Sequence, residues 1–486
     1  MVLAVVAEST LVGVSAFGVT GGSYPPGKSS GNTMQRDAKR RAVLLLTVKA
    51  TVAMLAMLLV AMALAASVRA DTFTVTTLSD SGTGSLRQAI ADAAPGDTID
   101  FSVNGTITLT SEELLIDKNL TIAGPGARRL SVSGNNQRRV FKVASGATAE
   151  ISGLTVTGGL AVGSNGASGL LGFPNGQSGF SGSDAGGGGI LNDGTLTLRD
   201  VAVTNNTTRG GLGGAGGRGG DGPDNTCGSS DNGGNGGFGG NGGSALGGGI
   251  RNGGTLTLQG STISGNRAEG SLGGSGGFGG RGGDDDFFCT GGNGGVGGRG
   301  GSGGSGKGGG IFDGGTLTVT NSTLDGNKAT GGLGGNGGRG GDGGSGGTTG
   351  TGGRGGDGGQ GGNGEGGGTH DPNGNAVFTN VTVSANEALR ASGGSGGSGG
   401  SGSPSGQSGF SGVPGAGQGG GVFSGGGIAI GNTIVALNTA SSSGFNIFGP
   451  FVNRSHNLVD TDPRLGLLQN NGGPTDTRAP LSGSPA

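Results

Sequence analysis

GGGIRNGGTLTLQGSTISGN, at residues 247–266, is the stretch that decides the fold, because similar blocks follow each glycine-rich tract of the chain. The other copies lie at 187–206, 308–327, 366–386 and 419–438, so successive starts are 60, 61, 58 and 53 residues apart (187 to 247, 247 to 308, 308 to 366 and 366 to 419). A recurring unit of this length marks a repeat protein, in which each unit buries its apolar face only by stacking on its neighbours.

Apolar side chains alternate with threonine inside the block. Leu256 and Leu258 flank Thr257, which is the period of a β-strand with one buried face. Each block ends on asparagine, which tolerates the left-handed backbone of a tight corner and whose amide can bond the same asparagine one layer away. These residues are Asn206, Asn266, Asn327, Asn386 and Asn438. The pattern predicts an all-β fold, a parallel β-helix; the alternatives, a β-sandwich or a propeller, would show hairpin turns and more aromatic residues.

The composition fits a solenoid. Of 486 residues, 131 are glycine, and the hydrophobic share of 30% is low for an ordinary globular core. A β-helix manages with less because its core is a thin column. The net charge of −2 offers no general attraction to nucleic acid or to anionic lipid, so we predict no nucleic-acid partner.

Residues 34–70 have the pattern of a secretory signal peptide. Basic residues follow Met34, the run 52–66 carries no charge, and small residues precede Asp71, where we expect cleavage. A membrane anchor is the alternative, but Lys49 leaves the run short of the roughly 20 residues that a span needs. We therefore predict a secreted or cell-surface protein that meets the membrane only through this segment. Residues 1–33 match no such pattern, and we expect translation to start at Met34.

The mature chain divides into four predicted parts. Residues 71–97 form an N-terminal cap, a strand followed by a short helix that Ser85 caps, which would cover the open edge of the first coil. Residues 98–158 hold the first coils, 159–438 the β-helix repeats with glycine-rich insertions, and 439–486 a C-terminal segment.

The insertions follow a Gly-Gly-X rhythm. Glycine-rich sequence is by default a flexible coil, but a strict period of three matches the polyproline-II helix, and two glycines per turn let such helices pack closely. The motif GGRGGD, at 216–221, 279–284, 337–342 and 352–357, places Arg and Asp on the same edge of such a helix. Nucleic-acid binding by these arginines is disfavoured because each has an aspartate beside it. The three carboxylates at 284–286 are interpreted as solvated rather than as a cation site.

Several segments resemble known bacterial surface proteins. TVTTLSDSGTGSLRQAIADAAPGDTIDF (74–101) is similar to the opening of proteins with the CSLREA-type motif, although Gly84–Ala89 lacks its Cys and Glu. The repeats resemble polymorphic outer-membrane-protein repeats, the insertions resemble PGRS-type repeats, and 455–486 is similar to a choice-of-anchor Q domain. The resemblance implies a right-handed parallel β-helix and a secreted or surface-displayed protein of unassigned activity. Such proteins usually carry a sorting segment after the last domain, so we expect this chain to be truncated.

The residues of catalytic chemistry are scarce. Polysaccharide lyases and hydrolases on β-helices need paired acids, or an acid with Arg and Lys, on consecutive coils. In the strands of the aligned blocks Arg199-Asp200 is the only charged pair, Trp is absent, and Tyr24 precedes the cleavage site. His370 and His456 are isolated and expected to be exposed and inert. We predict no catalytic, cofactor-binding or metal residue and no cofactor.

The composition and the resemblance together favour a non-catalytic, adhesin-like or surface-structural protein. Its partner would be an unidentified surface ligand, namely a glycan, a matrix component or another cell-surface molecule. A polysaccharide lyase or hydrolase is the alternative.

Two cysteines, Cys227 and Cys289, lie where the glycine rhythm breaks in consecutive insertions, which suggests loop tips. Stacked tips would be about 4.8 Å apart, and a disulfide needs Cα atoms within roughly 4.4–6.8 Å. Export supplies an oxidising compartment. We predict a Cys227–Cys289 disulfide; two free thiols on flexible loops are the alternative.

Overall fold

A computed structural model describes residues 40, 43–44, 47, 49–57, 70–224 and 231–486 of the chain. The chain divides into two units, Met1–Val68 and Arg69–Ala486, and the described residues of the first unit are helical. Most of the expected signal peptide and the whole of 1–33 lie outside the described residues, so both remain predictions. Among the described residues, no helix combines the length and the apolar character needed to cross a membrane.

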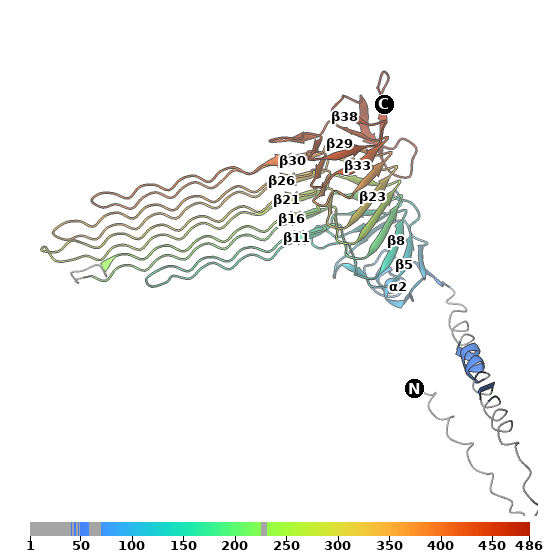
Figure 1. Cartoon of the computed structure of the whole chain (residues 1–486), viewed down its shortest axis with the longest axis horizontal. Helices are drawn as coiled ribbons and strands as arrows, with labels where there is room; N and C mark the ends of the chain where they lie inside the picture. Colours follow the sequence, from blue (N-terminus) through green and yellow to red (C-terminus); the bar gives the residue numbers. More distant parts are fainter. Residues whose placement is uncertain (1–39, 41–42, 45–46, 48, 58–69, 225–230) are drawn as a thin grey trace, which may run out of the picture. The chain divides into compact units, whose positions relative to one another are not determined.

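The second unit is a right-handed parallel β-helix, as predicted. In its described part, three long parallel sheets of 10, 9 and 8 strands wall the helix, and each complete coil adds a strand to each sheet (Figure 1). Sheet 1 runs in the order β1 (Thr72–Val75), β2 (Thr98–Phe101), β5 (Leu120–Ala123), β8 (Thr148–Ser152), β13 (Thr195–Arg199), β18 (Thr255–Gln259), β23 (Thr316–Thr320), β28 (Val377–Thr379), β33 (Ile428–Gly431) and β37 (Phe451–Asn453).

The other two walls follow sheet 1 around each coil. Sheet 2 contains β3 (Gly105–Thr108), β6 (Leu130–Ser133), β9 (Thr155–Thr157), β14 (Ala202–Thr204), β19 (Thr262–Ser264), β24 (Thr323–Asp325), β29 (Thr382–Ser384), β34 (Ile434–Ala436) and β38 (Leu458–Val459). Sheet 3 contains β4 (Leu114–Ile116), β7 (Phe141–Val143), β12 (Ile190–Asn192), β17 (Ile250–Asn252), β22 (Ile311–Asp313), β27 (Thr369–Asp371), β32 (Val422–Ser424) and β36 (Ile447–Phe448).

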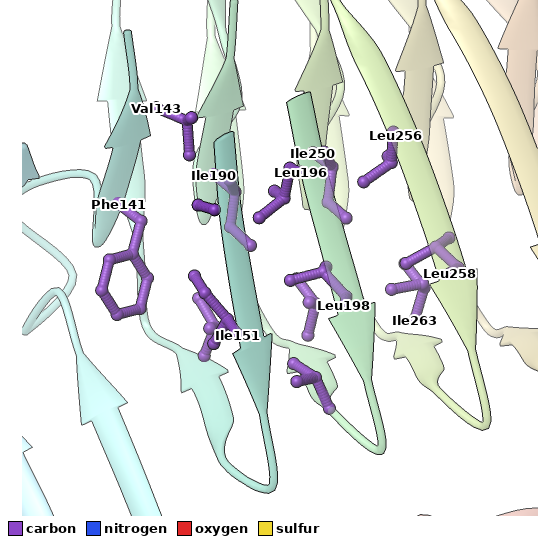
Figure 2. Packing of buried hydrophobic residues seen from close by; sticks show 14 of the residues in the cluster. Phe141, Val143, Ile151, Ile190, Leu196, Leu198, Ile250, Leu256, Leu258 and Ile263 are labelled. Carbon is purple, nitrogen blue, oxygen red and sulfur yellow. The ribbon is translucent and has the colours of Figure 1, made fainter. Parts of the chain in front are cut away.

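The core is the column predicted from the repeat. Leu196, Leu256 and Leu317 pair in register on neighbouring strands of sheet 1, and all three are fully buried. Figure 2 shows leucines and isoleucines of successive coils stacked inside the helix. Thr257 points outward between two buried leucines, so the assigned facing is confirmed.

A buried asparagine ladder closes one corner of the helix. The Nδ2 of Asn206 donates to Oδ1 of Asn266 at 2.9 Å, and Asn266 repeats the bond to Asn327 at 2.9 Å. The predicted layer-to-layer bonding is therefore confirmed and continues through Asn386 to Asn438. The prediction that the ladder asparagine itself adopts the left-handed backbone of the corner is wrong. The left-handed residue precedes the ladder asparagine, at Asn205, Gly265, Gly326, Ala385 and Leu437, because the ladder asparagine needs its side chain turned inward.

A cap covers the first coil. Helix α2 (Leu86–Asp92) packs Leu86, Ala89 and Ile90 into the core, and Ser85 accepts the hydrogen bond of the Gln88 amide at 3.2 Å. The predicted N-cap is confirmed, and the helix ends at Asp92. The cap hides the apolar end of the column.

The C-terminal segment first extends the helix and then turns back. An antiparallel hairpin, β39 (Leu465–Gln469) and β40 (Thr477–Pro480), follows the last coil. From it, Arg478 pairs with the buried Asp325 of sheet 2 at 2.6 Å. The Asp476 carboxylate also accepts from Arg128 at 2.7 Å, so the end of the chain is tied to both early and late coils.

The glycine-rich insertions form one ordered arm. They project from the helix as stacked hairpins (Figure 1). At the base of the arm, two short parallel sheets continue the coils. Sheet 4 contains β10 (Leu160–Val162), β15 (Thr207–Arg209), β20 (Arg267–Glu269), β25 (Lys328–Thr330), β30 (Glu387–Leu389) and β35 (Thr439–Ala440), and sheet 5 contains β11 (Ala185–Gly186), β16 (Ala245–Leu246), β21 (Gly306–Lys307), β26 (Gly364–Glu365) and β31 (Gly417–Gln418).

Candidate binding surface

Each insertion of the arm has an outgoing and a returning limb, and the limbs form two rows. The Gly213 amide bonds the Leu272 carbonyl in the next outgoing limb at 3.0 Å, and the Gly237 amide bonds Gly217 in the opposite row at 2.8 Å. These bonds recur every three residues, as expected of packed polyproline-II-type helices. The ordered alternative for the insertions is thus the one that the structure adopts.

The two glycines of each triplet face different neighbours. A Cβ on Gly276 would lie 1.9 Å from the carbonyl oxygen of Gly298 in the opposite row. A Cβ on Gly277 would lie 1.9 Å from the oxygen of Gly217 in the preceding insertion. Both clashes involve main chain, so neither position accepts a side chain. Only the third residue, X, points away from the arm, and the two rows therefore present X residues on two opposite faces.

The outermost insertions lose glycine where a neighbour is missing. Among the residues that the structure describes, no layer precedes the first insertion, and Ala167, Leu170 and Phe173 occupy the positions that face the preceding layer in other insertions. The returning limb of the last insertion has no limb beyond it in the opposite row, and Ser405, Ser408 and Ser411 replace the glycine that would face one. Glycine content along the arm therefore follows the number of packed sides.

Polar X residues hold the layers together. The Oδ1 of Asn235 accepts from the Val296 amide in the next layer at 2.9 Å, and Oδ1 of Asp342 accepts from the Ser401 amide at 2.7 Å. Each such bond satisfies an X amide that no glycine carbonyl reaches. Asp, Asn and Ser at X are thus explained by the stacking itself.

The GGRGGD motifs form ion pairs within one limb. Arg218 pairs with Asp221 and Arg354 with Asp357, both at 2.6 Å. The hydrogen bond from Arg281 and, next in size, the hydrogen bond from the Ser345 amide lower the pKa of Asp284 to about 2. Asp284 is therefore engaged in an ion pair within its limb and in hydrogen bonds to the next layer. The described residues contain no group of three or more side chains suited to hold a metal ion.

Apolar X residues have no such structural role. Leu212, Leu272 and Leu333 follow one another in consecutive layers of the outgoing row, and each is about half exposed, at 46%, 46% and 55%. Together with Ser275 and Asn336 they line a groove of about 490 Å³ across the layers. A leucine cannot accept the amide of the next layer, so packing of the arm does not account for these side chains.

The opposite face carries its own apolar groups. Phe238 and Val296 are exposed X residues on the returning row and line a second groove of about 410 Å³. Phe410, on the last layer, lies 5.3 Å from the Arg354 guanidinium. The arm thus presents apolar side chains at fixed spacing on both faces, which sequence reasoning missed because the tracts read as glycine with scattered substitutions.

The predicted disulfide would join the tips of two insertions of the arm. Cys289 lies at the tip of the third insertion, where its carbonyl accepts from the Gly347 amide of the fourth insertion at 2.7 Å. Neighbouring tips are therefore in register at this end. Cys227 lies outside the described residues, so the pairing with Cys289 stays a prediction.

The prediction for His370 is wrong, while His456 is exposed as expected. His370 is 3% exposed and lies between the rings of Phe312 and Phe423, with centroids 5.2 and 4.6 Å away. Its Nε2 lies 3.1 Å from Glu365. Outward residues of sheet 3 are covered by the base of the arm, and this tertiary contact buries the histidine.

The contact between the base of the arm and sheet 3 also shifts the pKa values of His370 and Glu365. Burial lowers the pKa of His370, against the opposing effect of the Glu365 hydrogen bond. Burial alone would raise the pKa of Glu365, but the His370 hydrogen bond and the charge of Lys307 lower it to about 2. His370 and Glu365 are largely closed to solvent, while the Lys307 side chain is about one-third exposed.

Charged side chains on the outer faces of the strands form ion pairs, such as Arg209 with Glu269 at 2.8 Å and Lys328 with Glu387 at 2.7 Å on sheet 4. Arg199 pairs with Glu150 on sheet 1 at 3.2 Å, and both are about two-fifths exposed. Asp313 and Asp371 are buried in a corner, where the amides of Gly374 and Ala376 hold Asp371 at 2.7 and 2.9 Å. These two carboxylates face the interior and cannot reach a polymer bound outside.

Comparison with known proteins adds little to this picture. No family model matches the chain, and no curated sequence matches it significantly. Among solved structures, pectate lyase Pel9A is 14% identical, with 82% of this chain and 84% of that chain covered and a TM-score of 0.29. The ORF18 protein of Geobacillus virus E2 is 12% identical, with 54% and 57% covered and a TM-score of 0.17. Both scores are too low to bear on function.

Proposed function

We propose that the chain is an exported, non-catalytic protein of the cell surface or the secreted fraction, which binds a surface ligand through the faces of its glycine-rich arm. The observation that carries this proposal is the row of exposed leucines Leu212, Leu272 and Leu333. They stand at X positions, where a polar side chain could accept an amide of the next layer and a leucine cannot. Exposed apolar patches on soluble proteins mark interaction sites.

The rigidity of the arm supports a binding role. Its limbs are joined by backbone hydrogen bonds along and between the rows, for example Gly277 to Gly237 at 2.8 Å. A surface ordered before binding loses little conformational entropy when the ligand arrives. Two open, grooved faces of this kind suit an extended partner, a glycan chain or a matrix protein, better than a small molecule in a deep cleft.

Export rests on the predicted signal peptide at 34–70 and on the resemblance to bacterial surface proteins. The partner is expected to be a glycan, a matrix component or another cell-surface molecule. The chain charge of −2 gives no reason to expect nucleic acid among its ligands.

A binding screen with two matched double variants tests the arm. The secreted protein is applied to arrays of glycans and matrix proteins and to whole cells. Leu212→Asp with Leu272→Asp places two charges on the outgoing face in the second and third insertions. Asn241→Asp with Ser302→Asp places the same charges in the same insertions on the returning face. We expect the first pair to reduce binding at least about tenfold, since each buried aliphatic contact is worth about 1.5–3 kcal/mol, and the second to leave it unchanged.

Two outcomes would overturn the proposal. Equal loss in both double variants, or no loss in either, would show that the outgoing face is not the binding surface. Depolymerisation of an acidic polysaccharide by the purified protein, followed with and without calcium, would assign the chain to the polysaccharide lyases or hydrolases instead.

A further inference from the structure

A cavity of about 410 Å³ lies at the base of the arm, beside its first layer. Strand β10 is the first strand of sheet 4 and β11 the first strand of sheet 5 in the described chain. The preceding coil supplies no strand to pair with either, so the cavity lies between two open strand edges. Its wall is mainly polar, with an apolar side, and includes Glu113, Arg139, Asp184, Arg251, Leu160 and Leu246.

All three guanidinium nitrogens of Arg139 are bonded to groups at the open edge of β11 or beside it. Its Nε donates to the Gly187 carbonyl at 2.8 Å and one terminal nitrogen donates to Gly186 at 2.9 Å. The other terminal nitrogen pairs with Glu113. The charges of Arg139 and Glu113 therefore cancel, and the guanidinium is fixed in place by main-chain carbonyls.

Arg251 differs from Arg139. It lies on β17, in the outward column of sheet 3, and its stem crosses beneath β11 toward the cavity: a Cβ on Gly186 would lie 2.3 Å from Arg251 Cδ. Among the residues that the structure describes, its guanidinium takes part in none of the ion pairs, whereas Asp184 receives the Ser244 amide at 2.6 Å. Arg251 thus presents a half-buried cation to a polar cavity.

The chemistry of the cavity selects one kind of ligand. A guanidinium with open donors binds a carboxylate through two parallel hydrogen bonds. Glu113 and Asp184 offer acceptors for hydroxyl groups, and Leu160 and Leu246 offer an apolar side for the C–H face of a ring. The volume is within the roughly 300–1,000 Å³ of small-ligand pockets. We propose that this cavity binds a carboxylate-bearing sugar, a uronic acid unit free or at the end of an acidic glycan.

This site is separate from the two faces of the arm, so it goes beyond the proposed function and stands or falls independently of it. Calorimetric titration of the full secreted protein with sodium glucuronate, glucose and inorganic phosphate tests it. We expect saturable binding of glucuronate and none of glucose. Arg251→Gln keeps the stem and removes the charge, and it should weaken glucuronate binding at least about tenfold. Arg251→Lys keeps the charge but loses the planar guanidinium that donates two parallel hydrogen bonds. Its affinity for glucuronate should therefore lie between those of the parent protein and of Arg251→Gln.

The matched control is Arg267→Gln, an exposed arginine of the same repeat outside the cavity, for which binding should be unchanged. Thermal unfolding of each variant checks that the fold is kept. Absence of glucuronate binding, equal binding of glucose, or unchanged affinity in Arg251→Gln would each overturn the proposal. Phosphate binding as tight as that of glucuronate would reduce the site to a general anion site and overturn the sugar assignment. Loss of arm-dependent adhesion with intact glucuronate binding would instead count against the proposed function alone.

Discussion

At the scale of single residues, Asp313 is a buried carboxyl group whose ionised form is destabilised by its surroundings. It is fully buried in a polar row, where Asn192 donates to Asn252 at 2.7 Å and Asn252 donates to Asp313 at 2.6 Å. The row continues to the buried Asp371. Burial raises the pKa of Asp313 from 3.8 to about 6, against the hydrogen bonds of Asn252 and Gly315, which lower it. The charge of Asp371 adds to the rise in the pKa of Asp313. The folded state therefore holds this proton more tightly than the unfolded state. The associated stability is present below about pH 3.8 and is lost as the pH rises through 6.

Replacing Asp313 with Asn should therefore stabilise the protein at neutral pH. A shift of about two pKa units corresponds to up to about 3 kcal/mol, which the variant should recover at pH 8 and not at pH 4. Unfolding free energies across this pH range provide the measurement. Asn252→Asp is the control, since it adds another buried carboxylate to the row of Asp313 and Asp371 and should destabilise the fold at pH 8. A variant Asp313→Asn no more stable than the parent at pH 8 would contradict the assigned protonation.

At the scale of one element, strand β18 carries opposite roles on adjacent residues. Leu256 is buried between Leu196 and Leu317, and Thr257 points outward. Leu256→Asp buries an unpaired charge between two coils and should abolish folding or cost more than about 4 kcal/mol. Thr257→Asp should change stability by less than about 0.5 kcal/mol. Circular dichroism and thermal unfolding compare the two, and a similar loss in both variants would contradict the facing of the strand.

Limbs of the arm behave as elements of a different kind. Gly277→Ala places a Cβ against the main chain of Gly217, and two hydrogen-bonded backbones cannot give way as a side chain can. We expect the second and third insertions to separate locally while the β-helix remains folded. Faster amide exchange at the arm, with unchanged protection of the coils, would reveal it. Ser408→Ala, at a position with no limb beyond it, should leave exchange unaltered; equal disturbance by both changes would refute the packing rule.

At the scale of the whole molecule, the arm and the β-helix share one register. Thr290 of the third insertion and Thr348 of the fourth lie 2.7 Å apart at their hydroxyls, far from the coils that set the spacing. A disulfide between Cys227 and Cys289 would lock the second and third tips in the same way. Mass spectrometry of the non-reduced, secreted protein should find one peptide pair that joins them. If both thiols are alkylated before reduction, the tip of the second insertion does not stack on the third.

The sequence by itself determined whatever depends on local period. Alternation of Leu256 and Thr257 determined the strand and its inward face, and the terminal asparagines determined the ladder. The rhythm of three allowed packed limbs, but only the structure showed that the insertions are ordered. Each feature repeats from coil to coil, so neighbouring copies meet in register wherever the coils stack. The replacement of glycine in the first and last insertions can also be seen in the sequence. Its physical reason becomes clear only when the structure shows which layers are outermost.

Only the tertiary structure decided what one repeated element covers on another. The base of the arm closes over sheet 3 and buries His370, which no local pattern indicates. It also brings Arg139 and Arg251 to one cavity from different coils. Such contacts depend on how sheets 4 and 5 fold against the outward column of sheet 3. The period of two or three residues fixes which way a side chain points, but not which distant segment it meets.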